Sequence, residues 1–205
     1  MSTVDPAGPA ARTIATLWWV MLAGSVLIFG LVMALVAGAF RRRGSTPDDA
    51  RMERRWIIGL GLAFPVAVLA ALLGYGLVAG ERLLPRERAD LVQVSARASR
   101  TDWSFGYADR PGFETRGVLH IPAGRPVDVE ITTTDVIHSF WVPRLAGKLD
   151  AVPGHVNTLR IEADRPGRFA GVSAEFSGPG YHVLGFAVVA HDAEGWADFL
   201  EEQAE

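Results

Sequence analysis

Two long blocks without a charged residue limit what this chain can fold into. Residues 17–40 read LWWVMLAGSVLIFGLVMALVAGAF, and residues 56–80 read WIIGLGLAFPVAVLAALLGYGLVAG. Each block exceeds the roughly 20 residues that a helix needs to cross a hydrocarbon layer about 30 Å thick. Because lipid offers the backbone no hydrogen-bond partners, each block should form a closed helix. Residues 17–80 therefore predict a transmembrane hairpin, and Pro65 should kink its second helix.

The first block could instead be a cleaved signal peptide. Its apolar run is longer than the core of a signal peptide, and the segment before it carries a single basic residue, Arg12. These two features favour a retained membrane helix.

The loop between the blocks, residues 41–55, is rich in arginine. Short loops with an excess of basic residues stay in the cytoplasm. Both termini should then lie on the outer side of the plasma membrane, and everything after Gly80 should be exported. The sequence thus predicts a multi-pass membrane protein in contact with lipid. The arginines of the loop are Arg41, Arg42, Arg43, Arg51, Arg54 and Arg55.

The pattern changes after the second block. Residues 81–100 predict a charged linker and a first strand, residues 101–192 a compact domain, and residues 193–205 a C-terminal helix and tail. Short alternating runs between Gly/Pro turns, without a long amphipathic helix, are typical of an all-β sandwich of Greek-key type. The Pro/Ala-rich residues 1–16 predict a flexible N-terminus. The alternating runs are 92–99, 117–121, 127–132, 155–161, 167–172 and 184–190.

Composition excludes several classes of site. The chain has no cysteine, which excludes disulfides, iron–sulfur clusters and any zinc or copper site built on thiolate. Its formal net charge of -3 gives no basic character, so we expect no nucleic-acid partner. We find no catalytic constellation in the chain itself.

Four segments carry a resemblance to a known family. The stretch from Asp135 to Leu145 (DVIHSFWVPRL), followed by GKLDAVPG up to Gly154, resembles subunit II of the haem–copper respiratory oxidases. The stretches ERRW from Glu53, WSFGY from Trp103 and GVSAEFSG from Gly171 are similar to further motifs of that family. The resemblance implies a cupredoxin-like exported domain. It also implies a non-catalytic subunit of a complex that reduces oxygen and translocates protons, with haem and copper held in subunit I.

The loop after Gly171 resembles the copper loop of that family, but without its ligands. In the cytochrome c oxidases this loop reads C-x-E-x-C-G-x-x-H-x-x-M and, with an upstream histidine, holds the dinuclear copper centre CuA. Here Ser173 and Ser177 stand at the cysteine positions, Tyr181 at the histidine position and Leu184 at the methionine position, while His138 matches the upstream histidine. Bridging thiolates are essential to such a centre, and a neutral hydroxyl is a poor copper ligand. We therefore expect that CuA is lost and that this chain firmly binds no cofactor of its own.

Two further features favour a quinol as the electron donor. His182 lies one residue after the family's histidine position, and in an extended segment a shift of one residue points a side chain to the opposite face. Family members that accept electrons from cytochrome c begin the aromatic segment with W-x-W, whereas here Thr101 fills the first position and Trp103 the second. The loop spelling S-G-P-G-aromatic resembles that of the quinol-oxidising members.

The resemblance assigns roles to several other residues. Glu175 matches a glutamate that helps hold magnesium at the contact with subunit I, and a carboxylate is the hard oxygen donor that magnesium prefers. Glu53 matches a glutamate at the mouth of a proton-uptake channel. Either carboxylate could instead serve only in a local ion pair. Residues expected at the interface with subunit I, in a complex that also contains a subunit III, are Trp103, Trp141, Arg144 and Asp150, the last two as an ion pair.

Two alternatives stay open. Cytochrome c could deliver electrons directly to a haem without CuA. The chain could also be a membrane-anchored mononuclear copper binder that uses His138, His182 and Glu175, although the position of His182 and the absence of sulfur ligands disfavour it.

Overall fold

The computed structural model describes residues 2–41, 49–84 and 90–201. The predicted loop residues Arg42 and Arg43, much of the charged linker and the end of the C-terminal tail lie outside the described residues, as does the side chain of Arg51. The chain divides into two compact units: residues 18–84 form one, and residues up to Leu17 join the part after the linker in the other.

The first unit consists of apolar helices. Helix α1 (Pro9–Arg41) is followed by α2 (Asp49–Trp56), a π-helical run η1 (Ile57–Ala63) and α3 (Phe64–Leu83). Two stretches, Pro9–Arg41 and Met52–Glu81, are long and apolar enough to cross a membrane, and none of their apolar windows is buried within the protein. Such exposed apolar surface would be unfavourable in water, whereas lipid accommodates it. The helices contain the predicted spans 17–40 and 56–80 and extend beyond them.

The π-helical run ends beside Pro65, where the sequence predicts a kink. Proline has no N–H, and in an α-helix its ring collides with the carbonyl group four residues earlier, that of Gly61. In the structure, the N–H of Phe64 donates to the carbonyl of Gly59, five residues back. A wider turn before the ring gives the backbone a hydrogen-bonding pattern that avoids this collision.

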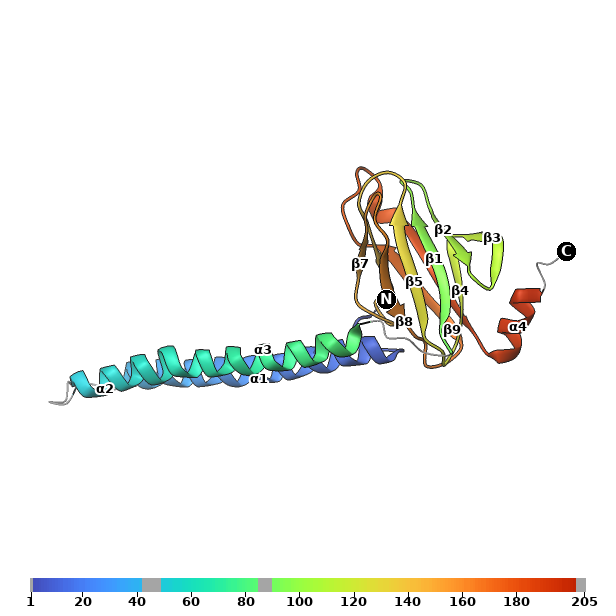
Figure 1. Ribbon diagram of the computed structural model, residues 1–205. Coiled ribbons are helices and arrows are strands. Elements are labelled where there is room, and N and C mark those ends of the chain that lie inside the picture. The colour runs from blue at the N-terminus through green and yellow to red at the C-terminus, as the bar shows by residue number, and fades with distance from the viewer. Residues whose placement is uncertain (1, 42–48, 85–89, 202–205) are drawn as a thin grey trace. The chain divides into compact units, whose positions relative to one another are not determined.

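The second unit is a β-sandwich, as predicted (Figure 1). Most neighbouring strands are antiparallel, but β1 pairs in parallel with β5, and β4 with β10. One five-stranded sheet has the order β3 (Arg110–Arg116), β2 (Trp103–Tyr107), β1 (Val92–Ala98), β5 (Val127–Thr133), β8 (Asn157–Ile161). The other has the order β4 (Val118–Pro122), β10 (Gly185–His191), β9 (Gly167–Ser173), β6 (His138–Trp141), β7 (Leu149–Ala151). Helix α4 (Ala193–Glu201) follows β10, close to where a short C-terminal helix is predicted.

The core lies between the two sheets because each strand turns alternate side chains inward. Strand β1 alternates strictly between buried and exposed residues, and β2 buries its first, third and fifth residues. Phe140 and Phe186 from the second sheet stack at 4.8 Å between ring centroids, and both contact Trp103 from the first. The largest fully buried side chains include Trp103, Phe105, Phe140, Leu119, Ile121, Ile131, Leu145 and Ile161.

The segment before the first membrane helix packs on the sandwich. The N–H of Ala7 donates to the carbonyl of Arg144 at 2.8 Å, and the carbonyl of Ala7 accepts the N–H of Asp164 at 2.8 Å. The backbone approach is so close at Gly8 that a Cβ atom there would lie 2.1 Å from the carbonyl oxygen of Glu162. Only glycine fits at this point.

Two ion pairs flank this backbone contact. Arg12 pairs with Asp164, and Arg144 pairs with Asp5 at 2.8 Å. The flexible N-terminus predicted for residues 1–16 did not anticipate these contacts. They join residues well over 100 positions apart, which local composition does not report.

Candidate functional site

The loop between β9 and β10 contains the serine residues of the candidate site. Ser173 ends β9, Ser177 follows in the loop, and a short 3-10 turn (Tyr181–Val183) leads into β10. Gly178 and Gly180 adopt positive φ angles of 115° and 87°, a region that glycine enters without steric cost. These two glycines let the loop fold back on itself.

Four buried polar atoms lie in and beside this loop without a hydrogen-bond partner among the described residues. They are the hydroxyl oxygens of Ser139, Ser173 and Ser177 and the Nδ1 atom of His138. Ser173 and Ser177 are 5 % and 9 % exposed, and His138 and Ser139 are fully buried. Buried polar groups are nearly always paired, so four such atoms at one end of the sandwich mark an unusual site.

Strand pairing explains how His138 and Ser173 come to face the same side. In the antiparallel pair β6–β9, Phe140 lies opposite Ser173, and the carbonyl of Ser139 accepts the N–H of Ala174 at 2.9 Å. Side chains alternate along a strand, so His138 and Phe140 point to one face and Ser139 to the other. His138 and Ser173 therefore both face the core.

Asp135 fixes the orientation of His138. Its Oδ1 atom lies 2.9 Å from the Nε2 atom of the imidazole. Burial raises the pKa of Asp135, but hydrogen bonds from His138, Val136, Arg100 and Thr133 outweigh it and lower the pKa to about 2. An ionised carboxylate only accepts hydrogen bonds, so Nε2 carries the proton and Nδ1 presents a lone pair. The same carboxylate–histidine arrangement orients ligands in metal sites.

The remaining loop side chains do not complete a metal site. His182 is exposed, whereas His138 is fully buried. Tyr181 packs edge-on against Phe176, which is 70 % exposed. In the part of the chain that the structure describes, no group of three or more His, Cys, Asp or Glu side chains gathers in a way that could hold a metal ion. A pocket of about 170 Å³ beside the loop is lined by Arg100, Ser177, Gly178, Pro179, Tyr181 and Leu184.

Glu175 is accessible at the surface. Its Oε2 atom lies 3.8 Å from the ammonium of Lys148, and its Oε1 atom accepts the N–H of Phe176 at 3.2 Å. Its side chain is 41 % exposed, so it could add one oxygen ligand to a cation held mainly by another subunit. The ion pair with Lys148 is the local role that the sequence left open.

Glu53 lies exposed on α2, in the other unit. The next residues, Arg54 and Arg55, line a pocket of about 420 Å³ with Ile58 and Gly59 at the start of the apolar stretch. The carboxylate thus lies next to an arginine pair at one end of the span.

Two of the expected interface residues have other positions. Trp103 is 1 % exposed, so it has almost no surface to offer to another subunit, and the interface role predicted for it is wrong. Arg144 pairs with Asp5 rather than with Asp150. The backbone carbonyl of Asp150 accepts a hydrogen bond from the side-chain amide of Asn157 at 2.7 Å.

Trp141 remains available at the surface. It lines a pocket of about 320 Å³ whose other walls come from the N-terminal segment and from the chain after β6. The lining is mostly apolar, with one ammonium group. The pocket residues are Thr3, Ala11, Ile14, Trp141, Pro143, Ala146, Gly147, Lys148 and Ala174.

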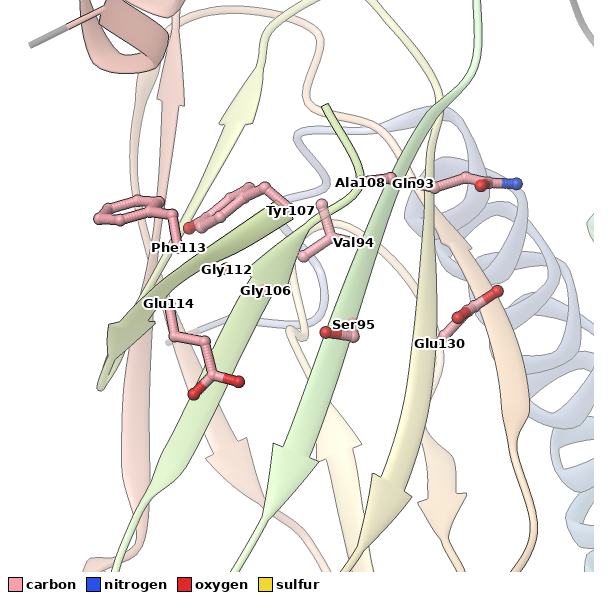
Figure 2. A pocket seen from close by; sticks show the side chains of 10 residues that line it. All are labelled: Gln93, Val94, Ser95, Gly106, Tyr107, Ala108, Gly112, Phe113, Glu114 and Glu130. Carbon is pink, nitrogen blue, oxygen red and sulfur yellow. The ribbon is translucent and has the colours of Figure 1, made fainter. Parts of the chain in front are cut away.

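A further pocket lies on the outer face of the first sheet (Figure 2). Its volume is about 340 Å³, and Figure 2 shows Glu114 and Glu130 on different strands with Ser95 between them. Gly106 opens it, because a Cβ atom there would lie 2.7 Å from the hydroxyl of Ser95. Glu114 also approaches Arg97 at 4.0 Å, so this pocket lies in an ordinary polar sheet face.

Sequence reasoning missed two features near the candidate site and across the sheet. The role of Asp135 was not predicted, although its position three residues before His138 was a usable signal. Contact between His120 and His191, 71 positions apart, could not be seen without the fold.

Comparisons with known proteins agree with this geometry. The family described as "Cytochrome C oxidase subunit II, periplasmic domain" matches residues 93–190. The sequence is 28 % identical to cytochrome c oxidase subunit 2 of Alkalihalophilus pseudofirmus, over 100 % of this chain and 64 % of that protein. It is 27 % identical to quinol oxidase subunit 2 of Bacillus cereus, over 100 % of this chain and 74 % of that protein. The chain thus spans somewhat under two thirds of the first relative's length.

A solved structure confirms the fold. The periplasmic domain of subunit II of cytochrome oxidase from Bradyrhizobium japonicum superposes with a TM-score of 0.51 at 22 % identity. The match covers 58 % of this chain and 96 % of that domain. The sandwich is therefore cupredoxin-like, and the predicted architecture of apolar helices followed by a cupredoxin-like domain is confirmed.

Proposed function

Because this chain belongs to the subunit II family of the haem–copper terminal oxidases, we propose that it is the subunit II of a quinol-oxidising complex and holds no CuA centre. One observation carries the proposal. The positions that the family fills with two bridging cysteines hold Ser173 and Ser177, whose buried hydroxyls have no partner among the described residues. A neutral hydroxyl cannot replace a thiolate in a delocalised copper pair.

The geometry around His138 supports this reading. Asp135 still orients the imidazole as it would a metal ligand, at 2.9 Å. The partners that should share the metal are a tyrosine and a leucine at positions 181 and 184, with an exposed histidine between them. One oriented ligand without its companions fits a former copper site.

The chain then acts by position. Electrons pass from a membrane quinol to haem in subunit I, oxygen is reduced there, and protons are translocated. The membrane-anchored hairpin docks against subunit I, with subunit III also in the complex, and the sandwich covers the outer side. Glu53 would collect protons at the cytoplasmic end, and Glu175 would add an oxygen ligand to magnesium at the subunit contact.

The proposed orientation places both termini on the outer side of the plasma membrane. The arginine-rich loop supports it through the preference of basic loops for the cytoplasm. The contacts of Ala7 with Arg144 and Asp164 also require that the N-terminal segment and the sandwich share one side of the membrane.

Metal content and donor specificity of the purified complex test the proposal. We expect quinol to sustain oxygen consumption, reduced cytochrome c to fail as a donor, and the near-infrared absorbance of a mixed-valence copper pair to be missing. A variant with Ser173→Cys, Ser177→Cys, Tyr181→His and Leu184→Met serves as the positive control for that absorbance. The absorbance in the unaltered complex, or rapid cytochrome c oxidation without quinol oxidation, would contradict the proposal.

A cytochrome c donor is the second candidate. The relative from Alkalihalophilus pseudofirmus is named a cytochrome c oxidase subunit, which favours it. Cytochrome c oxidation without CuA absorbance would establish this route.

A mononuclear copper site is the third candidate. The free Nδ1 atom of the fully buried His138 favours it. Stoichiometric copper retained by the full chain in detergent and lost in His138→Ala would establish it.

A further inference from the structure

Two histidines on neighbouring strands form a hydrogen-bonded pair away from the copper loop. His120 on β4 and His191 at the end of β10 belong to strands that run in parallel, and their Nδ1 and Nε2 atoms lie 2.8 Å apart. The rings stack at 5.1 Å between centroids with an interplanar angle of 15°. At this distance one nitrogen donates a proton and the other accepts it.

Helix α4 rests on this pair through aromatic rings. Phe199 stacks on His120 at 4.3 Å with an interplanar angle of 7°, and on His191 at 5.7 Å. Trp196 contacts His191 at 6.4 Å and Phe199 at 5.5 Å. Phe199 and Trp196 are 8 % and 6 % exposed, so the docked helix buries both rings. Tyr107 lies under the same helix, 5.2 Å from Phe199.

The surroundings favour the neutral pair. Burial lowers the pKa of His120 to about 4, and the charges of His191 and of Arg168 on β9 act in the same direction. Burial also lowers the pKa of His191, against the opposing effect of Asp192 at the start of α4. From β2, the hydroxyl of Tyr107 accepts the N–H of His120 but brings no charge at these pH values.

Protonation of both rings is incompatible with this arrangement. Two N–H donors would point at each other across 2.8 Å, and two positive charges would stack at 5.1 Å. The rings must then separate, and separation removes the flat surface on which Phe199 stacks. We propose that the pair of His120 and His191 makes the docking of α4 depend on pH, so that the helix leaves the sandwich when the outer medium is acidic.

The direction follows from proton linkage. The docked state has pKa values below the ordinary 6.5 of histidine, so it binds fewer protons than the open state between pH 6.5 and about pH 4. Docking is therefore complete above pH 6.5 and weakens as the pH falls toward 4. For one such histidine, linkage gives a change of roughly 30-fold in the opening equilibrium between pH 7.5 and 5. Solvent screening of partly exposed rings reduces this to about tenfold.

Hydrogen exchange of the full chain in detergent tests the proposal. The exchange of amides in α4 is followed at pH 7.5 and 5.0 and corrected for the intrinsic pH dependence of exchange. We expect the protection of α4 to fall about tenfold at pH 5.0, while that of β1 and β5 in the opposite sheet stays constant. Unchanged protection of α4 would overturn the proposal.

Matched variants identify the titrating groups. His120→Gln with His191→Gln should leave the protection of α4 nearly independent of pH, whereas His155→Gln, at an exposed position, should keep the full response. Phe199→Ala should open α4 at both pH values, which separates loss of docking from loss of titration. If the double histidine variant kept the acid response, the proposal would be refuted.

Discussion

Replacing the two serines of the former copper loop by alanine should make the sandwich more stable. Ser173 and Ser177 are 5 % and 9 % exposed, and neither hydroxyl has a hydrogen-bond partner among the described residues. A buried hydroxyl without a partner costs about 1–3 kcal/mol of desolvation. Alanine removes that cost and leaves only a small gap in place of one oxygen atom.

The size of the effect follows from these terms. After allowance for the lost packing contacts, each substitution should gain about 1 kcal/mol. The two sites lie in one loop, so their effects need not add, and the double variant should gain about 1–3 kcal/mol. For a domain of this size that corresponds to a rise in Tm of roughly 4–10 °C.

Thermal unfolding of the full chain in detergent, followed by the tryptophan signal, measures the shift, since Trp103 lies in the core of the sandwich. Ser99→Ala is the matched control. The Ser99 hydroxyl donates to Asp102 at 2.6 Å and accepts the N–H of Asp102 at 3.1 Å, so its loss should cost about 1 kcal/mol. A loss of stability in the Ser173→Ala and Ser177→Ala variants would refute the reasoning, because it would mean that the hydroxyls bind a partner.

Two further predictions concern the N-terminal segment and the support of His138. Gly8→Ala should destabilise the sandwich by about 1–3 kcal/mol in thermal unfolding, because its Cβ atom would lie 2.1 Å from the carbonyl oxygen of Glu162. Gly38→Ala, which has open space around its Cβ position, should not, and equal effects of the two would argue against the contact. Asp135→Asn should remove a pH-dependent part of the stability: with the pKa of Asp135 lowered from 3.8 to about 2, that part is complete above pH 3.8 and is lost as the pH falls toward 2. Denaturant unfolding at a series of pH values should show the variant with a flatter profile in that window, and an unchanged profile would mean that the bond to His138 does not stabilise the folded state.

Local pattern was enough for much of the architecture. Uninterrupted apolar runs predict the membrane helices, because few other structures tolerate them. Strict alternation predicts β1 and β5, because each strand has one face toward the core. The serines of the copper loop could be read directly from its spelling.

Contacts between distant segments could not be predicted in the same way. The pairing of Arg144 with Asp5 joins residues 139 positions apart, and the expected partner Asp150 was chosen only because it lay near in sequence. Trp103 was misplaced for another reason. Its alternation with Phe105 and Tyr107 puts all three rings on the inner face of β2, and that periodicity should have outweighed the family analogy.

The stacking of the chain's beginning on its later part sets an order on biogenesis. Ala7 is made first and Arg144 and Asp164 much later, yet they share backbone hydrogen bonds. In the proposed orientation, the sandwich can close only around a start that has already been carried across the bilayer. A molecule inserted upside down would leave those amides unmatched and its last seam open. Correct threading would thereby be proofread by the fold itself before any partner is met.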